Sequence, residues 1–554
     1  MSAKRLLLVG GVAGGASCAA RARRLSEDAE IVLFEKGPYV SFANCGLPYY
    51  VGDVIREEQN LLVATPELFR ERFRIDVRVG HEVTAIDRAD RTIQVRDRRT
   101  GTLYREPYDA LVLSPGAYPI RPPLPGIDLP GIFVTRTIPD SRAIRRWIEE
   151  KKARRAAIVG GGYIGLEMAE NLVRRGLSVT IVEMLPQVMP PLDPEMAEPV
   201  HEHLRNSGVR LLLEHPVTAF EARADGTLSV HAGSGVSVEA DLVLLAVGIR
   251  PETALARAAG LEIGAAGGIR VNEQLRTSDP AIWAVGDAVE VRDFVTGQWC
   301  LIPLAGPANR QGRIAADAIF GRPSVFRGVQ GTAVCGVLGM TLALSGASEK
   351  ALRRAGLEYE KIYLHPGHHA GYYPGARPIS IKLLFHPRDG RVLGVQAVGT
   401  EGVDKRVDVI AMAIQKGATV FDLEEAELCY APQFGAAKDP VNLAGMVAAN
   451  VMRGDAVLAH WEDLPASDAV VVDVRSPKEF EAGHLDKAIN IPLPELRDRM
   501  EELRPHGQIW SYCGVGQRSY YATRALLQNG FPARNLSGGY LTYKAIQGTR
   551  KRGK

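Results

Sequence analysis

One glycine-rich turn occurs twice in this chain, at Gly10 and again 150 residues later at Gly160, and it constrains the fold more than any other feature. In both copies a short apolar run precedes the turn and a helix-forming stretch follows it. A second apolar run then ends at a glutamate, Glu35 or Glu183. Strand, glycine turn, helix and strand in this order are typical of a dinucleotide-binding βαβ unit. The sequence therefore predicts two such domains.

The apolar patterns also predict where the elements begin and end. The first unit is expected to have strands over residues 5–9 and 31–34 around a helix over 16–25, and the second to have strands over 156–159 and 178–182 around a helix over 166–175. Later patterns predict strands over 379–385, 392–398, 469–474 and 508–512 and a helix over 407–417.

The second turn, residues 160–165, has the complete G-x-G-x-x-G pattern. Gly160 permits the tight turn, Gly162 lets the backbone approach a pyrophosphate, and Gly165 allows the helix to lie close to the strand. Glu183 can bond both ribose hydroxyls and would repel a 2′-phosphate, so we expect NADH to be preferred and leave NADPH use open. The alternative is a glycine turn of some other α/β fold.

The first turn is less regular, because Val12 stands where the middle glycine is expected between Gly10 and Gly15. Glu35 lies at a spacing typical of the ribose-binding acid and supports a nucleotide site here. Lys4 and the apolar run to Ala20 also resemble a signal peptide. Cleavage would destroy the nucleotide site, so we expect this segment to stay. The scattered cysteines do not fit a secreted disulfide framework, so we expect the protein to be cytoplasmic.

Length and composition argue against several classes of protein. A length of 554 residues is too great for one hydrophobic core. A formal net charge of +3 gives no case for nucleic acid, and no run of about 18 apolar residues indicates a membrane span. The six cysteines include no C-x-x-C pair, which favours neither a metal site nor a secreted disulfide framework.

Three later segments indicate which nucleotide lies where. Residues 277–288, T-S-D-P-A-I-W-A-V-G-D-A, resemble the second flavin-binding motif of the flavoproteins with two dinucleotide-binding domains, and residues 243–251 and 111–117 resemble that family's connecting segments. The resemblance spans residues 1–325. It implies two sets of cofactor contacts: FAD at Gly10, Gly15, Glu35, Lys36, Gly116 and Asp287, and NAD(P)H at Gly160, Gly162, Gly165, Glu183 and Gly248.

The segment S-F-A-N-C-G-L-P-Y at residues 41–49 contains a candidate redox cysteine, Cys45. Dithiol reductases of this superfamily carry C-x4-C here, but this chain has no second cysteine nearby. A lone thiol must form a mixed disulfide with substrate, a persulfide or a sulfenic acid. We expect Cys45 to be held as a thiolate by a helix start and the flavin. The alternative is a buried inert cysteine, the role we expect for Cys18, Cys300, Cys335 and Cys429.

Two further segments narrow the resemblance to the coenzyme A-disulfide reductase and NADH-dependent persulfide reductase group. They are residues 367–376, G-H-H-A-G-Y-Y-P-G-A, and residues 426–442, and both resemble the dimerisation domain of that group. The resemblance implies a homodimer in which tyrosines of one subunit reach the active cysteine of the other. It assigns that role to Tyr430 and to Tyr372, with Tyr373 as the alternative to Tyr372. Their hydroxyls could protonate a departing thiolate, or they could be ordinary interface residues.

The same resemblance implies coenzyme A as a ligand. Arg21 and Arg24 lie three residues apart on one helix face, which suits phosphates, although a solvated basic face is the alternative. The contacts carried over from the group are Ser17, Arg21, Arg24, Ser41, Asn44, Asn309 and Lys438.

The C-terminal hundred residues resemble a rhodanese domain, on segments V-D-V-R at 472–475, E-F-E-A-G-H-L at 479–485 and A-I-N-I-P at 488–492. The expected strand over residues 508–512 leads into a loop with the sequence C-G-V-G-Q-R-S, residues 513–519. Backbone N–H groups of such a loop would face Cys513 and stabilise its thiolate and persulfide, and Arg518 would add positive charge. Asp473, Arg475 and His484 are expected to be structural.

Together these features predict an α/β protein: two Rossmann-like dinucleotide-binding domains, for FAD and for NAD, an α+β dimerisation domain and a C-terminal rhodanese domain. The expected boundaries are 1–150 and 276–325 for the FAD domain, 151–275 for the NAD(P)H domain, 326–452 for dimerisation and 456–554 for rhodanese.

The predicted activity is NAD(P)H-dependent reduction of coenzyme A disulfide, coenzyme A persulfide or polysulfide through Cys45. Cys513 is expected to carry sulfane sulfur, and no metal is expected. One alternative is an NADH peroxidase or oxidase that uses a cysteine sulfenic acid; those relatives carry a histidine where this chain has Ala13. Another is a sulfur-trafficking or redox-sensing protein.

Overall fold

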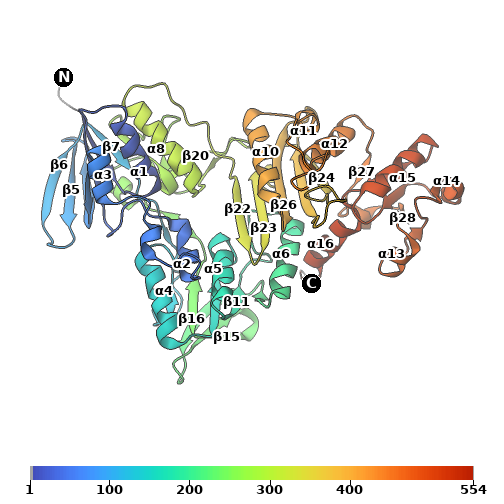
Figure 1. The fold of residues 1–554 in the computed structure, drawn as a ribbon, viewed down its shortest axis with the longest axis horizontal. Coiled ribbons are helices and arrows are strands. Elements are labelled where there is room, and N and C mark those ends of the chain that lie inside the picture. The colour runs from blue at the N-terminus through green and yellow to red at the C-terminus, as the bar shows by residue number, and fades with distance from the viewer. Residues whose placement is uncertain (1–3, 553–554) are drawn as a thin grey trace. The chain divides into compact units, whose positions relative to one another are not determined.

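The computed structural model describes residues 4–552, which form two compact α/β units (Figure 1). Unit 1 comprises residues 4–182 and 215–331, and unit 2 comprises residues 183–214 and 332–552. Within the described residues, no helix is both long and apolar enough to cross a membrane.

The first βαβ prediction corresponds to a five-stranded parallel sheet of unit 1, in the order β19-β7-β1-β2-β3. Its strands are β1 (Arg5–Val9), β2 (Glu30–Glu35), β3 (Asp76–Val79), β7 (Ala110–Leu113) and β19 (Ile282–Ala284). Helices α1 (Ala13–Arg23) and α8 (Ala305–Ile319) pack against each other. They meet at glycine, since a Cβ on Gly312 would lie 2.2 Å from the carbonyl oxygen of Gly14.

The second prediction corresponds to parallel strands in the order β11-β10-β16-β9. These strands are β9 (Ile132–Phe133), β10 (Arg155–Val159), β11 (Ser178–Val182) and β16 (Leu242–Leu245). The helices of this part are α4 (Ile138–Lys151) and α5 (Tyr163–Arg174). All four residues of β16 are buried, as expected for a strand covered on both faces.

Short elements complete unit 1. The antiparallel pairs and triplets are β4 (His81–Asp87) with β5 (Thr92–Asp97) and β6 (Leu103–Pro107), β13 (Val217–Ala222) with β14 (Leu228–Ala232) and β15 (Val236–Ala240), and β8 (Ala117–Pro119) with β17 (Ile249–Pro251). The others are β18 (Ile269–Arg270), β20 (Val289–Arg292), β21 (Trp299–Cys300), α2 (Leu47–Val51), α3 (Pro66–Phe73) and α7 (Ala254–Ala258).

Unit 2 contains an antiparallel sheet in the order β22-β23-β26-β25-β24. The strands are β22 (Ala333–Val337), β23 (Met340–Gly346), β24 (Glu360–Leu364), β25 (Ile379–Phe385) and β26 (Val392–Gly399). Helix α10 (Val403–Lys416) packs on β23 and β26, and α12 (Pro440–Met452) packs on β24 and β25 (Figure 1). Nearby elements are α6 (Pro194–Asn206), β12 (Arg210–Leu212), α9 (Glu349–Ala355) and α11 (Val420–Glu424).

The C-terminal part of unit 2 is a parallel sheet in the order β27-β31-β30-β28-β29. Its elements are β27 (Leu458–Ala459), β28 (Val470–Asp473), α13 (Pro477–Glu481), β29 (Ile489–Asn490), α14 (Leu496–Arg499), β30 (Ile509–Tyr512), α15 (Gln517–Gln528), β31 (Ala533–Leu536) and α16 (Gly539–Arg552). Helix α16 packs on α6 of the same unit.

The predicted elements exist, but several helices begin earlier than expected. Helix α1 begins at Ala13 and not at residue 16, and α5 begins at Tyr163 and not at residue 166. In both cases the glycines belong to the first helical turn, although their low helix propensity made them look like turn residues. Helix α10 similarly begins at Val403 and not at residue 407.

The expectation that four cysteines lie in the core is wrong for one of them. Cys18 and Cys335 are buried and Cys300 is partly buried, but Cys429 is exposed. Cys429 lies in the loop between α11 and α12, where no sheet or helix face covers it.

Candidate active sites

The glycines of the first turn are required by close backbone contacts. Gly10 has a φ of +92°, and a Cβ there would lie 2.1 Å from the carbonyl oxygen of Ser114. A Cβ on Gly15 would lie 1.9 Å from the carbonyl oxygen of Gly10. Val12 precedes α1 and makes no side-chain cap to it. In the first turn of α1 the N–H of Gly15 donates to Oγ of Ser114 at 3.0 Å. The N-cap residue itself supplies no cap, so the helix start suits an anionic phosphate.

The remaining FAD candidates meet at the carboxyl edge of the same sheet. Glu35 ends β2, where its carboxylate accepts hydrogen bonds from the backbone N–H groups of Gly11 (3.0 Å) and Gly37 (2.8 Å). Lys36 follows it and is exposed. Gly116 follows β7 with a φ of +74°, and Asp287 lies in the 3₁₀ turn after β19. Ligands of open parallel sheets bind at this edge, so the residues fit a dinucleotide.

Each of the three glycines in the second turn has its own spatial surroundings. A Cβ on Gly160 would lie 2.3 Å from the carbonyl oxygen of Ala246, and one on Gly165 would lie 2.1 Å from that of Gly160. A Cβ on Gly162 would meet no protein atom within 4 Å, so this position faces open space. Gly162 precedes α5 without a side-chain cap. This geometry fits the approach of a pyrophosphate to the backbone.

Two further NAD(P)H candidates have defined local conformations. Gly248 lies before β17 with a φ of +110°, a conformation that L side chains rarely adopt. Glu183 directly follows β11, and its Oε1 accepts a hydrogen bond from the backbone N–H of Leu185 at 2.8 Å.

Cys45 lies in a 3₁₀ turn, η1 (Asn44–Gly46), that leads into α2. The cysteine is exposed, whereas Leu47 and Tyr50 of α2 are buried beneath it. Asn44 donates from Nδ2 to the carbonyl oxygen of Arg136 (3.3 Å). Ser41, at the start of this loop, has a φ of +47°, and its carbonyl oxygen accepts from the N–H of Val63 at 2.8 Å.

The protein groups around Cys45 oppose its ionisation, so the expected thiolate depends on the flavin. Although the residue is exposed overall, partial burial of its sulfur raises the pKa of the Cys45 thiol. The carboxylates of Glu167 and Asp287 raise this pKa further, while a backbone hydrogen bond lowers it. Helix α2 has only five residues, so its N-terminus offers little positive charge. Stabilisation of a Cys45 thiolate therefore has to come from a bound group.

Glu167 is a functional candidate that the motif analysis missed. It lies on α5, two residues beyond the last glycine of the complete turn, and it acts electrostatically on Cys45. Burial, followed by the charge of Glu170, raises the pKa of Glu167 to about 7. The sequence shows that Glu167 follows the glycine motif, but only the folded structure shows that it lies near Cys45.

The coenzyme A candidates are only partly brought together. Ser17 of α1 and Asn309 of α8 are hydrogen-bonded through their side chains. Arg21 is paired with Asp317 of α8 at 2.7 Å, whereas Arg24 is exposed. Arg21 therefore already has a carboxylate partner within the protein. Lys438 is exposed in the loop before α12 of unit 2.

The structure distinguishes Tyr372 from Tyr373. The hydroxyls of Tyr372 and Tyr430 lie 2.5 Å apart and share a hydrogen bond, although the two side chains come from different loops of unit 2. Their exposed fractions are 75% and 48%. The ring of Tyr373 instead lies edge-on against that of His369, with centroids 5.5 Å apart. Tyr372 and Tyr430 thus present a pair of hydroxyls to solvent.

Arg406 of α10 connects the two loops that carry this pair, and sequence reasoning missed it. Its buried guanidinium donates to the carbonyl oxygen of His368 (2.6 Å) and to Oδ2 of Asp439 (2.8 Å). Asp439 also caps α12. The N–H of Ala370 donates across the loops to the carbonyl oxygen of Gly435 (2.8 Å).

Cys513 is fully buried at the end of β30. Its Sγ accepts hydrogen bonds from the backbone N–H of Gly516 (3.2 Å) and from Oγ of Ser519 (3.5 Å). Gly516 has a φ of +93°, so the loop turns back over the sulfur. The N–H of Tyr540 donates to the carbonyl oxygen of Cys513 at 2.7 Å and supports the loop from behind. This cradle of donors suits a sulfur anion.

Arg518 interacts with Cys513 through its charge and through a side-chain hydrogen bond, as expected, but it is also paired with a carboxylate. Its guanidinium makes a two-point ion pair with Glu479, with N–O distances of 2.8 and 2.6 Å. Glu479 was part of the rhodanese-like pattern, but nothing in its spacing indicated this pairing.

Asp473, Arg475 and His484, which were expected to be structural, make contacts within the fold. Asp473 and Arg475 form a buried ion pair at 2.6 Å, and Arg475 also donates to the carbonyl oxygen of Gly483. The ring of His484 stacks on that of Phe480 with centroids 3.7 Å apart. These contacts connect β28 to the segment that carries Glu479.

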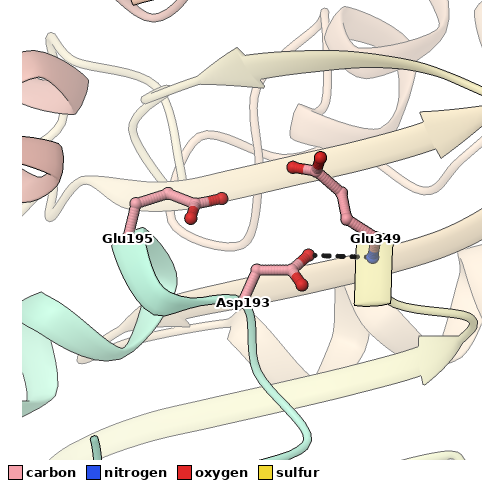
Figure 2. Close-up of side chains that lie close together, drawn as sticks. All are labelled: Asp193, Glu195 and Glu349. Atoms are coloured by element: carbon pink, nitrogen blue, oxygen red, sulfur yellow. Dashed lines mark hydrogen bonds between the residues drawn. The ribbon is translucent and has the colours of Figure 1, made fainter. Parts of the chain in front are cut away.

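Three carboxylates of unit 2, from Asp193, Glu195 and Glu349, lie close enough together to suggest a metal site (Figure 2). The ammonium group of Lys382 instead bonds all three, with Asp193 Oδ2 at 2.9 Å. Lys382 is completely buried. The carboxylates therefore surround an internal cation supplied by the protein.

Comparison with protein families identifies the class of protein that these sites define. The pyridine nucleotide-disulphide oxidoreductase family matches residues 4–312, its dimerisation domain matches residues 332–439, and the rhodanese-like domain matches residues 458–546. The chain belongs to the pyridine nucleotide-disulphide oxidoreductase family and carries a C-terminal rhodanese-like domain. The predicted family and fold class are thereby confirmed, and the family implies FAD and NAD(H) as cofactors.

Individual solved structures that resemble this chain narrow the comparison within the family. The crystal structure of reduced CoADR-RHD from Bacillus anthracis is 47% identical, with a TM-score of 0.97 and coverage of 100% of this chain and 99% of that one. An NAD-dependent persulfide reductase from A. fulgidus is 38% identical, with a TM-score of 0.91 and coverage of 97% and 100%.

Curated relatives cover about four-fifths of the length of this chain. Coenzyme A disulfide reductase of Staphylococcus haemolyticus is 34% identical over 80% of this chain and 99% of its own length. An NADH oxidase of Methanocaldococcus jannaschii is 37% identical over 79% and 97%.

Proposed function

We propose that this protein is an NADH-dependent reductase of coenzyme A persulfide, coenzyme A disulfide or polysulfide, and that its rhodanese-like domain supplies sulfane sulfur. The observation that carries the proposal is that one chain contains two free cysteines in two different kinds of site. Cys45 is a solitary exposed thiol beside the carboxyl edge of a nucleotide-binding sheet, and Cys513 lies in a cradle of hydrogen-bond donors.

In this scheme the Cys45 thiolate attacks a sulfur atom of the substrate RS–SH. The S–S bond breaks, Cys45 keeps the RS group as a mixed disulfide, and hydrosulfide leaves. FAD held by Gly10, Gly15, Glu35 and Asp287 would, when bound, pass on the two electrons of NADH that cleave this mixed disulfide. The sum is RSSH + NADH + H⁺ → RSH + H₂S + NAD⁺. For a disulfide substrate the leaving group is a second thiolate.

The tyrosine pair supplies protons in this proposal. The hydroxyls of Tyr372 and Tyr430 of the partner subunit protonate the thiolate that departs from Cys45. The dimerisation-domain match and the exposed aromatic side chains of Tyr372, Tyr430 and Phe434 support a homodimer.

Substrate and cofactor contacts complete the proposal. Arg24 and Lys438, which are both exposed, are the proposed contacts for coenzyme A phosphates, and the other proposed contacts to coenzyme A are Ser17, Arg21, Ser41, Asn44 and Asn309. Glu183 bonds the ribose of NADH and disfavours the 2′-phosphate of NADPH. The proposed boundaries of the domains stay those given by the sequence, and the proposed compartment is the cytoplasm.

A substrate panel tests the proposal. Coenzyme A persulfide, coenzyme A disulfide, glutathione persulfide and polysulfide are each supplied at fixed NADH to wild type, Cys45→Ser and Cys513→Ser. We expect Cys45→Ser to lose NADH oxidation with every substrate, by at least a factor of about 10³. Cys513→Ser should keep reduction of coenzyme A persulfide but lose transfer from other sulfur donors. Full activity of Cys45→Ser would overturn the proposal.

An NADH oxidase is the second candidate, because a relative of that name is 37% identical. Cys45 would then cycle through a sulfenic acid. The presence of Ala13 in place of a histidine and the fused rhodanese-like domain favour the reductase. Faster NADH turnover with oxygen or hydrogen peroxide than with any persulfide would favour the oxidase. Slow turnover with every small substrate but fast sulfur transfer to a protein would instead indicate sulfur trafficking.

A further inference from the structure

The loop over Cys513 contains one charged side chain, Arg518, within residues 513–519. Both of its terminal nitrogens are engaged by the two carboxylate oxygens of Glu479, at 2.8 and 2.6 Å. This parallel geometry is the strongest arrangement for an arginine and a carboxylate. The pair borders Gly514, since a Cβ there would lie 3.6 Å from Nη2 of Arg518. Arg518 also hydrogen-bonds Cys513, so the carboxylate of Glu479 offsets the charge of the one cationic side chain beside the sulfur.

Glu479 is held in place independently of Arg518. It is the third residue of α13, where its Oε2 accepts hydrogen bonds from the backbone N–H (3.1 Å) and the hydroxyl (3.0 Å) of Ser476. This is a capping box, which fixes the side chain at the helix start. The bond from Arg518 lowers the pKa of Glu479 to about 2, so the carboxylate is charged at neutral pH. The pair is thus preformed.

A loop whose cation is offset by a carboxylate discriminates between sulfur donors by charge. Attack of the Cys513 thiolate on thiosulfate brings a monoanion to a dianion: Cys–S⁻ + S–SO₃²⁻ → Cys–S–S⁻ + SO₃²⁻. An unpaired cation is needed to offset this repulsion. Attack on the protonated form of an organic persulfide meets a neutral sulfur group: Cys–S⁻ + RS–SH → Cys–S–SH + RS⁻. In both reactions the sulfane sulfur moves without net oxidation or reduction.

We propose that Glu479 is a specificity-determining residue of the Cys513 site: by pairing with Arg518 it selects organic persulfides over thiosulfate as sulfur donors. This inference rests on the proposed sulfur-carrier function of Cys513 and names its donor class. Glu479 acts by offsetting the charge of Arg518 that a dianionic donor would otherwise meet, and it does not take part in the sulfur transfer itself.

The test measures sulfur loading of Cys513 directly. The holoenzyme is mixed without NADH with thiosulfate or with glutathione persulfide, and peptide mass spectrometry follows the gain of one sulfur atom at Cys513. Glu479→Gln keeps a capping-box residue but removes the charge. We expect it to raise the ratio of thiosulfate loading to persulfide loading on the order of tenfold. Glu481→Gln, an exposed glutamate of the same helix, is the matched control and should leave the ratio unchanged.

A second variant keeps the test decisive. In Glu479→Gln/Arg518→Gln the released cation is absent, so the ratio should return to the wild-type value. An unchanged ratio in Glu479→Gln, or a wild type that loads equally well from both donors, would overturn the inference while the sulfur-carrier function stands. If the wild type loads Cys513 from neither donor, both proposals fall together.

Discussion

Cys45 and Cys513 reach a reactive state by different routes. The groups around Cys513 donate hydrogen bonds to its sulfur, whereas the two carboxylates near Cys45 oppose its ionisation. A thiol with a raised pKa is a poor nucleophile at neutral pH. Reactivity at Cys45 is therefore conditional on what is bound beside it.

Removal of the Glu167 charge should make Cys45 more reactive. In protein freed of flavin, Glu167→Gln should lower the pKa of Cys45, because the carboxylate raises it in wild type. Alkylation of Cys45 by iodoacetamide at pH 8, followed by peptide mass spectrometry, should then be several-fold faster. The carboxyl of Glu167 has a pKa of about 7, so the two proteins should differ less at pH 6. Glu150→Gln, an exposed position on α4, serves as control, and equal rates at pH 8 would refute the argument.

The sequence indicated residues that belong to contiguous motifs, such as Gly10, Gly160, Cys45 and Cys513. It did not indicate Glu167, Arg406 or Glu479 as functional, because their roles depend on neighbours far away in the chain. Arg21 shows the converse: its spacing from Arg24 suited phosphates, but its carboxylate partner Asp317 lies 296 residues away. Charges that are compensated across the fold cannot be recognised from local spacing.

At the scale of elements, the sequence predicted strands best where apolar runs were short and bounded. The predicted strand over residues 379–385 coincides with β25, and the one over 178–182 coincides with β11. Helix starts were predicted less well, because glycine has a low intrinsic propensity but is needed where a helix begins against a strand. The loops of unit 2 had no pattern that could place Tyr372 beside Tyr430.

Arg406 should act as a positioning residue for those two loops. Arg406→Lys keeps a positive charge but lacks the planar guanidinium fork with which Arg406 bonds both His368 and Asp439, so the tyrosine pair should loosen. We expect kcat for persulfide reduction to fall roughly tenfold while KM for NADH is unchanged. Sulfur loading of Cys513 should also be unaffected, which separates this effect from general unfolding. Arg388→Lys, at an exposed ion pair, is the control; an unchanged kcat in Arg406→Lys would contradict the role.

At the scale of the whole molecule, the rhodanese-like part is joined to the dimerisation part of unit 2 by buried polar contacts. Lys361 bonds both Glu349 and Glu462, and His460 bonds Glu360 at 2.9 Å. His365 bridges Ser380 of β25 and Thr542 of α16, with both distances 2.9 Å. A flexible tether would not bury such groups, so these two parts of unit 2 form one body.

This arrangement predicts that unit 2 loses stability in mild acid. Burial lowers the pKa of His365 from 6.5 to about 4, so the unfolded chain binds a proton that the folded chain does not bind between these values. Stability should therefore fall as the pH drops from 6.5 toward 4, by on the order of 3 kcal/mol from this group. Urea unfolding at pH 7.5 and pH 5 measures the loss, which His365→Asn should reduce. His506→Asn, at an exposed position, should not change it.

The buried contacts between β24 and the last hundred residues also matter for building chimeric enzymes. Strand β24 presents Glu360, Lys361 and Tyr363 to partners in the appended module, including the hydroxyl of Ser537, which accepts from the N–H of Tyr363 at 3.2 Å. If that module were grafted onto a shorter homologue without these side chains, its docking face would be left with unsatisfied polar groups. A chimeric enzyme should therefore include β24 together with the rhodanese-like part, because the residues that this part needs for docking belong to the dimerisation part.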